Sequence, residues 1–216
     1  MKKVLIKDIT KCLTDRFLVL VLFIMLLFSV NCYSQEPLVV SKLSGVINFD
    51  GIPDEEIWQT IPALKMVMHT PIFGIEPTEI SVIKMAYDDQ YFYVSAILNY
   101  KNPEDMRAVG KKRDNTTPSC DWLGILLDTY NDRQNAVTFW TNPNGVRTEG
   151  TVKNDCIDSN ADINFSWNTF WDVKTVITKQ GWSAEFRIPF SSLRFQLHED
   201  KSLMGISIIR YSPTLA

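Results

Sequence analysis

The residues after position 34 form a series of short apolar runs separated by turn residues, with no helical stretch longer than about two turns. Alternation is clearest from residue 79 to residue 100. Side chains of a strand point alternately to its two faces, and Asp88 and Asp89 supply turn residues in the middle of this segment. The segment therefore predicts a β-hairpin, and a chain built from such units predicts an all-β fold.

Further strands are expected along the rest of the chain, at Asp121–Asp128, Asn135–Thr141, Val146–Val152, Phe170–Thr178, Trp182–Ile188 and Ser202–Arg210. The tetrapeptide from Asn142 to Gly145 is a strong hairpin turn. Helical turns are expected only at Pro53–Trp58 and Ser191–Phe195. This order predicts an antiparallel, jelly-roll-like β-sandwich.

The segment 1–34 is predicted to be a signal peptide outside this fold. A basic stretch containing five Lys and Arg residues precedes the apolar run Phe17–Val30. A membrane-spanning helix needs roughly 20 apolar residues, whereas a shorter run such as this one suits the hydrophobic core of a signal peptide. Ser34 provides a small residue for cleavage before Gln35. The sequence therefore predicts a protein exported to the periplasm, outer membrane or cell surface, with residues 35–216 as its single domain.

Two alternatives to simple cleavage stay open. Cys32 follows the apolar run, as the lipidated cysteine of bacterial lipoproteins does, although Asn31 stands where those proteins have a small residue. The apolar run could also remain as an uncleaved anchor. All three alternatives take the protein out of the cytoplasm.

Charge and motif content exclude two classes of function. Cleavage after Ser34 removes five of the 22 basic and two of the 25 acidic residues, which leaves a net charge of −6. A nucleic-acid partner would require a basic face. The sequence has no nucleophile-elbow motif and no metal-binding histidine pair, and its acids fall mainly in turns and at strand ends. We therefore expect a binding domain rather than an enzyme.

Four segments in order resemble the family 9 carbohydrate-binding modules, in the variant found at the N-terminus of exported proteins of Bacteroidetes-type bacteria. They are Ile47–Trp58, Met85–Leu98, Leu126–Val146 and Gly181–Phe195. The resemblance implies a β-sandwich that binds sugar and often calcium. Some members of the family are attached to glycoside hydrolases, and in the exported variant an outer-membrane β-barrel region commonly follows. The sequence ends just after its last expected strand, so we expect a domain truncated at its C-terminal end, without such a barrel.

The chain departs from the family at its sugar contacts. One family tryptophan lies where this chain has Pro118, Ser119 and Cys120, and Gly124 replaces an acid of the following strand. A second family tryptophan lies beyond the last strand. The resemblance therefore implies the fold more directly than the ligand.

The tryptophans are the natural candidates for sugar contact, because flat aromatic faces stack on the C–H groups of a pyranose ring. Trp140 and Trp167 lie near a hairpin turn and an acidic loop, where an exposed position is expected. Trp122 is a third candidate, although packing is the usual role of a tryptophan within a strand. Trp58 and Trp182 are expected in the core.

The loop that follows Val152 carries Asp155, Asp158 and Asp162. Oxygen ligands at alternating positions suit a hard cation such as calcium. The loop lacks the glycine and the distal glutamate of an EF-hand, and a solvated acidic loop is the alternative. We expect that the domain requires no cofactor. Calcium is the metal ion that this pattern of oxygen ligands would bind.

Two cysteines remain after residue 34. Cys120 precedes one predicted strand and Cys156 follows another, two turns later. An up-down-up path separates them by about 20 Å, and a disulfide needs Cα atoms within about 7 Å. We expect two free thiols.

Two functions fit the sequence. The first is a module that binds a polysaccharide or oligosaccharide, of the xylan or glucan type, within an exported system for polysaccharide breakdown. The alternative is a non-catalytic docking domain of an outer-membrane β-barrel protein, without sugar affinity.

Overall fold

The computed structural model describes residues 37–114, 117–197, 199 and 201–215. The chain divides after Val39, and the unit from Val40 to Ala216 contains every strand and helix described below. The signal-peptide prediction and Cys32 lie outside the described residues. No helix in the described part of the chain is long and apolar enough to cross a membrane.

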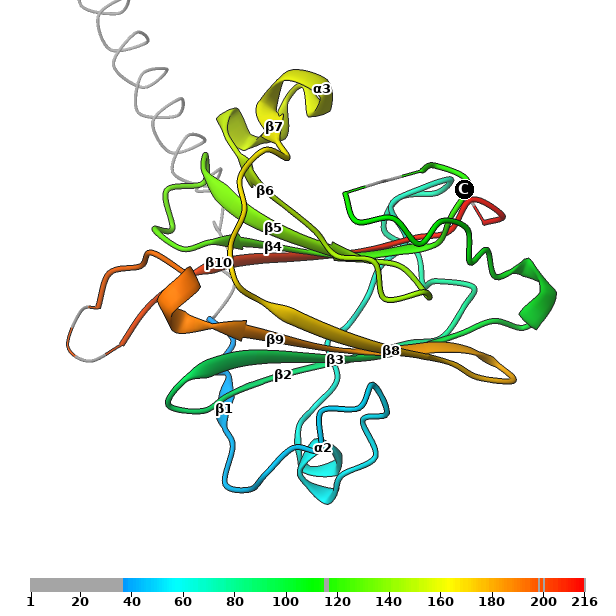
Figure 1. The fold of residues 1–216 in the computed structure, drawn as a ribbon, viewed down its shortest axis with the longest axis horizontal. Helices are drawn as coiled ribbons and strands as arrows, with labels where there is room; N and C mark the ends of the chain where they lie inside the picture. Colours follow the sequence, from blue (N-terminus) through cyan, green and yellow to red (C-terminus); the bar gives the residue numbers. More distant parts are fainter. Residues whose placement is uncertain (1–36, 115–116, 198, 200, 216) are drawn as a thin grey trace, which may run out of the picture. The chain divides into compact units, whose positions relative to one another are not determined.

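Two five-stranded sheets face each other as a β-sandwich (Figure 1), which confirms the predicted fold class. Sheet A has the order β1 (Ser41–Lys42), β2 (Ser81–Tyr87), β3 (Tyr91–Asn99), β9 (Gly181–Pro189) and β8 (Asp172–Ile177). Sheet B has the order β10 (Gly205–Tyr211), β4 (Trp122–Asp128), β5 (Ala136–Thr141), β6 (Thr148–Val152) and β7 (Ile163–Asn164). The strand pairs are antiparallel except for β1 with β2.

The helical elements are short, as predicted. They are α2 (Glu56–Thr60), η1 (Pro103–Asp105), η2 (Asn154–Cys156), α3 (Ser159–Asp162) and η3 (Phe190–Ser192). The segment between β6 and β8 contains more structure than expected, because β7 pairs with the end of β6 there.

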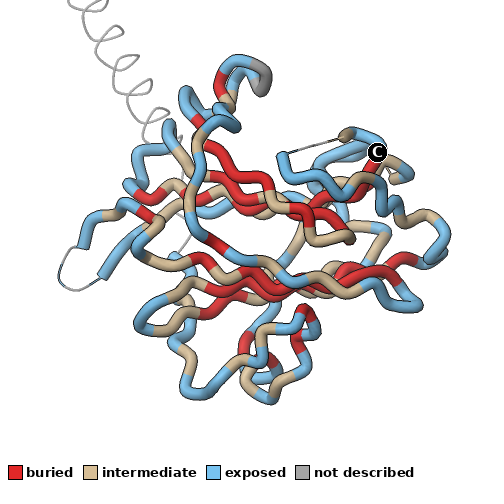
Figure 2. The backbone as a smooth tube through the Cα atoms, in the orientation of Figure 1, coloured by how far each residue is buried: buried red, intermediate tan, exposed pale blue. Residues whose placement is uncertain are grey.

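The core lies between the two sheets and follows the alternation of the strands. Leu123 and Ile125 of β4 face Val94 and Leu98 of β3 across a cluster in which all four side chains are fully buried. Each such aliphatic side chain contributes about 1.5–3 kcal/mol of transfer free energy. Figure 2 shows the buried residues gathered along the central strands of both sheets.

A second, smaller core covers the outer face of sheet A. Trp58 and Ile61, from α2 and the residue after it, pack on Ala86 and Tyr93. Trp58 and Trp182 are each 1% exposed, which confirms both as core residues. The segment before β2 thus acts as a third layer over sheet A.

The two thiols are free, as predicted. Residues near the start of β4 pair with the end of β5, since Leu123 lies opposite Thr141. The end of β6 pairs with the start of β5, since Val152 lies opposite Ala136. The cysteines that flank these strands therefore lie toward opposite ends of sheet B.

Candidate functional site

The outer face of sheet B gathers aromatic side chains from three neighbouring strands. Tyr211 of β10 pairs with Trp122 of β4, and Ile209 pairs with Gly124, which in turn pairs with Trp140 of β5. These residues alternate with the core residues Leu123, Ile125 and Phe139, so they point away from the core. We call the set Trp122, Gly124, Trp140, Ile209 and Tyr211 the outer platform.

Trp140 lies directly over Gly124. A Cβ atom at Gly124 would be 2.4, 2.5 and 2.6 Å from Cζ3, Cε3 and Cη2 of the Trp140 ring. Three nearly equal distances show that the ring face, rather than its edge, covers the glycine. The absence of a side chain at position 124 therefore lets the half-buried indole lie against the backbone of β4.

Trp122 and Tyr211 fix the segment before β4 at the edge of the outer platform. Trp122 donates a hydrogen bond from Nε1 to the carbonyl of Thr117, 2.8 Å away, and the Tyr211 hydroxyl donates to the carbonyl of Pro118 at 3.0 Å. Trp122 is only 4% exposed. Of the two, Tyr211 is therefore the one that offers surface to a ligand.

Cys120 also holds the segment before β4 in place. Its fully buried Sγ donates to the carbonyl of Arg107 at 3.1 Å and accepts from the Val109 amide at 3.2 Å. Burial raises the pKa of the Cys120 thiol above its ordinary value. Cys120 thus has a structural role in the segment before β4.

A further aromatic residue lies over β6 and was not among the sequence candidates. Phe165 is 39% exposed, and its Cδ1 is 3.2 Å from where a Cβ of Gly150 would be. Gly150 pairs with Thr138, on the outer face. Phe165 therefore extends the apolar surface beyond Trp140. In the sequence it lies between polar Asn164 and Ser166, and this feature could have indicated an exposed position.

The structure separates Trp167 from Trp140. Trp167 makes an edge-on contact with Phe139, with ring centroids 6.3 Å apart, and packs against the core cluster between the sheets. Trp140, the next residue after Phe139, points to the opposite face. The two tryptophans expected to act together therefore lie on opposite sides of sheet B.

The acidic loop does not bring its predicted metal ligands together. Among the described residues, no group of three His, Cys, Asp or Glu side chains is placed to hold a metal ion. Asp162 instead accepts hydrogen bonds from the Asp158 amide at 2.9 Å and from Nδ2 of Asn154 at 3.0 Å. These bonds lower the pKa of Asp162 below its ordinary value. Calcium binding through Asp155, Asp158 and Asp162 stays a prediction.

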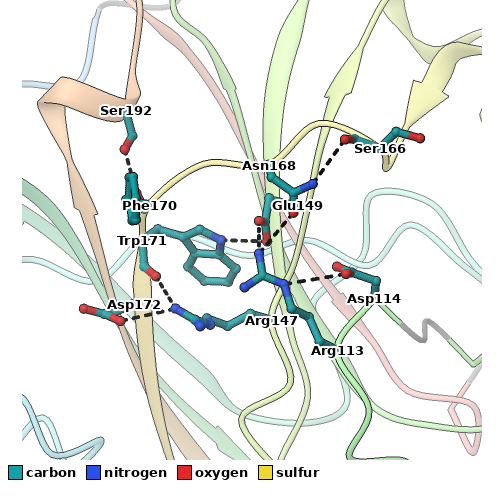
Figure 3. A network of polar contacts seen from close by, with 10 residues as sticks. All are labelled: Arg113, Asp114, Arg147, Glu149, Ser166, Asn168, Phe170, Trp171, Asp172 and Ser192. Carbon is teal, nitrogen blue, oxygen red and sulfur yellow. Dashed lines mark hydrogen bonds and ion pairs between the residues drawn. The ribbon is translucent and has the colours of Figure 1, made fainter.

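A polar network fills the opposite, inner side of β6 (Figure 3). The side chain of Glu149 is fully buried and forms an ion pair with Arg113. Its second oxygen accepts from Nε1 of Trp171 at 2.9 Å, and Arg113 also donates to Oδ1 of Asn168 at 3.3 Å. The network ties the segment around Arg113 and the residues before β8 to β6, and we assign it a structural role.

Comparison with known proteins supports the fold. No family model matches the sequence, and no curated protein matches it either. Among solved structures, a family 9 carbohydrate-binding module from Caldicellulosiruptor kristjanssonii in complex with glucose matches with a TM-score of 0.51 and 19% identity, over 83% of this chain and 92% of that chain. A family 9 module from the same organism in complex with cellotriose matches with a TM-score of 0.47 and 19% identity, over 83% and 90%. The chain therefore has the fold of the family 9 carbohydrate-binding modules, as its sequence segments implied.

Proposed function

We propose that the domain is a non-catalytic module that binds a β-linked polysaccharide, of the xylan or glucan type, on its outer platform. The observation that carries this proposal is the half-buried ring of Trp140, laid over Gly124 with Tyr211 on the same face. Aromatic rings on a flat sheet match the apolar faces of successive pyranose rings. The solved module that shares this fold was in complex with glucose.

The same geometry favours weak binding. Gly124 offers no carboxylate to a sugar hydroxyl, and the indole N–H of Trp140 is buried, so it cannot reach one. A ring stacked without hydrogen bonds to the hydroxyls gives little orientation or specificity. We expect dissociation constants in the millimolar range, equivalent to about −4 kcal/mol, rather than the micromolar range, about −8 kcal/mol.

Affinity electrophoresis and calorimetry against xylan, β-glucans and their oligomers test the proposal. Trp140→Ala should weaken binding severalfold, because it removes the ring from the outer platform. Phe170→Ala is the matched control, since Phe170 is an aromatic residue that is 88% exposed and lies before β8 in sheet A, away from the outer platform. Equal retardation of the two variants would contradict the assignment. Release of reducing sugar that depends on one carboxylate would contradict a non-catalytic role.

A docking domain without sugar affinity is the second candidate. Large apolar side chains are exposed in the segment that leads into β2, namely Val67, Ile72, Phe73, Ile75 and Ile80. Exposed apolar surface of this kind is typical of protein–protein contacts. If the domain binds none of the polysaccharides, this function is favoured.

We also propose that the protein is exported, on the basis of the sequence of segment 1–34. Mass spectrometry of the protein from its native host should give Gln35 as the first residue. A first residue of Cys32 carrying lipid would instead show a lipoprotein.

A further inference from the structure

Strand β10 leaves one edge of sheet B open. It pairs with β4 along its whole length, and no other described strand lies on its opposite side. Ile206, Ser207 and Ile209 are exposed, in contrast to the mostly buried residues of β4 beside them. The backbone N–H and C=O groups on the outer side of β10 are therefore available to a further strand.

The other three sheet edges in the described part of the chain are short or covered. β1 and β7 contain two residues each. β8 carries the charged residues Asp172 and Lys174, and its Thr175 hydroxyl donates to the carbonyl of Pro143, in the turn between β5 and β6, at 3.1 Å. A Cβ on Gly51 would lie 3.0 Å from the backbone of β8, so the loop around Gly51 also covers that strand. Native sheets usually protect their edges in such ways, and β10 is the exception.

β10 has none of the residues that usually protect an edge strand. It contains no proline and only one charged residue, Arg210. The guanidinium of Arg210 is turned toward sheet A, where it donates to the carbonyls of Ile80 at 3.0 Å and Asn99 at 2.9 Å. This charge therefore does not block the open edge, and the exposed isoleucines of β10 supply apolar surface beside it.

We propose that β10 pairs with β10 of a second copy of this chain, antiparallel and across a two-fold axis, so that the two B sheets join into one continuous sheet. Among the described strands, only β10 offers a second copy an open edge of equal length, because β1 and β7 are too short and β8 is covered. The contact is therefore the same on both copies and closes after two chains.

The register follows from full overlap of the two strands, which places Ile208 opposite its own copy. Ser207 then lies opposite Ile209 of the partner subunit, and Ile206 lies opposite Arg210 of the partner subunit. No like charges meet across this pairing, and like charges directly opposite each other would destabilise it. A shift by one residue would instead turn the second sandwich over.

The pairing joins two outer platforms on one face of the sheet, and this consequence rests on the proposed function. Ile209 and Tyr211 of β10 belong to the outer platform, and alternation keeps Ile209 of the partner subunit on the same face. Five strand spacings separate the two Trp140 rings, which gives about 24 Å. One polysaccharide chain contacts both platforms, so that weak binding at each is strengthened by the other. A short oligomer reaches only one platform and gains nothing.

Sedimentation of the purified chain over a range of concentrations tests the pairing. We expect the mass of the unmodified chain to rise from one chain to two as the concentration increases. Ile206→Lys should stay at one chain, because it places a like charge opposite Arg210 of the partner subunit. Ile206→Glu places an opposite charge there and should still pair. Ile177→Lys, at an exposed isoleucine of edge strand β8, is the matched control and should behave as the unmodified chain.

Two sedimentation results would overturn the pairing between copies. The first is a single chain at every concentration, which would leave the edge of β10 to a strand of another protein. The second is a mass of two chains for Ile206→Lys as well. Hydrogen exchange of the unmodified chain needs no variant. The amides of β10 should exchange more slowly at high than at low protein concentration, whereas those of β8 should not change, and equal exchange of β10 at both concentrations would also overturn the pairing.

Sugar binding tests the joined platform separately. Retardation on a polysaccharide should be weaker by at least about tenfold for Ile206→Lys than for Ile177→Lys. Calorimetry with a short oligomer should give both variants the same dissociation constant. Equal retardation of the two variants would overturn the joined platform even if the two chains pair. Failure of every variant to bind any polysaccharide would contradict the proposed function alone, since sedimentation measures the pairing without sugar.

Discussion

At the scale of single residues, Gly124 determines whether Trp140 can serve as a platform. The indole occupies the volume that any side chain at position 124 would fill. A β-strand normally disfavours glycine, which loses backbone entropy and has no side chain to pack. Here the missing side chain is replaced by the neighbouring aromatic ring.

Gly124→Ala should therefore displace the Trp140 ring. A Cβ within 2.6 Å of three ring atoms requires the indole or the strand to move, and overpacking of this kind costs about 1–3 kcal/mol. Urea unfolding followed by tryptophan fluorescence measures the cost, and affinity electrophoresis measures the loss of sugar binding. Gly45→Ala is the matched control, because nothing lies within 4 Å of its Cβ position. Equal stability of the two variants would contradict the packing described.

The two free thiols should differ in reactivity. Cys120 is fully buried, whereas Cys156 is half-buried. Burial raises the pKa of both thiols, and for Cys156 the charges of Asp162, Asp155 and Asp158 add to the effect. Alkylation at about pH 8, followed by peptide mapping, should label Cys156 before Cys120. In urea the two rates should become similar, and a native 120–156 disulfide would contradict the strand order.

At the scale of elements, β6 joins the two sheets through the side chain of Glu149. This carboxylate is buried on the inner face of sheet B, and Trp171, which precedes β8 of sheet A, donates to it. Trp171 also stacks on Phe186 of β9, with centroids 5.8 Å apart. Arg113 supplies the positive charge that makes the burial of Glu149 tolerable.

Arg113→Met should destabilise the domain by about 1–3 kcal/mol, because it leaves a buried carboxylate without its cation. The estimate is at the lower end for a buried pair since the side chain of Arg113 is 42% exposed. Glu149→Gln in the Arg113→Met background should recover part of the loss, as it removes the unpaired charge. A double-mutant cycle of urea unfolding measures the coupling. Additive effects of the two changes would contradict the ion pair.

At the scale of the whole molecule, Arg210 of β10, an edge strand of sheet B, connects that sheet to β2 and β3 of sheet A. From β10 it donates to the carbonyl of Ile80 at 3.0 Å, to the Ser81 hydroxyl at 2.8 Å and to the carbonyl of Asn99 at 2.9 Å. Its guanidinium lies 4.6 Å from the ring centroid of Tyr100. One side chain thus spans β10, β2 and β3.

Arg210→Lys should lower the free energy of unfolding by about 1–3 kcal/mol. A lysine keeps the charge, yet a single ammonium group cannot reproduce the planar fork that reaches two strands at once. Thermal or urea unfolding checks the change, with Arg194→Lys at an exposed position as the control. An unchanged midpoint would show that the sandwich does not depend on this contact.

The sequence by itself determined the class of fold and the order of the hairpins. Alternation in Tyr91–Asn99 and the turn after Thr141 specify strands and their neighbours, because both depend on interactions between residues close in the chain. Because the order of the hairpins follows from local turns, it also predicted that Cys120 and Cys156 lie toward opposite ends of sheet B. Trp58 and Trp182 were also placed correctly in the core.

Only the tertiary structure decided which face each side chain occupies and what it meets there. Trp140 and Trp167 are both aromatic residues near turns, but the alternation of β5 points Trp140 outward, while its contact with Phe139 places Trp167 against the core. Glu185 and the backbone amides of Asp50 and Gly51 are far apart in the sequence and meet only in the folded chain, a contact that no local pattern encodes. Burial and pairing of these side chains depend on how two sheets and a covering loop pack, and that is a property of the folded chain alone.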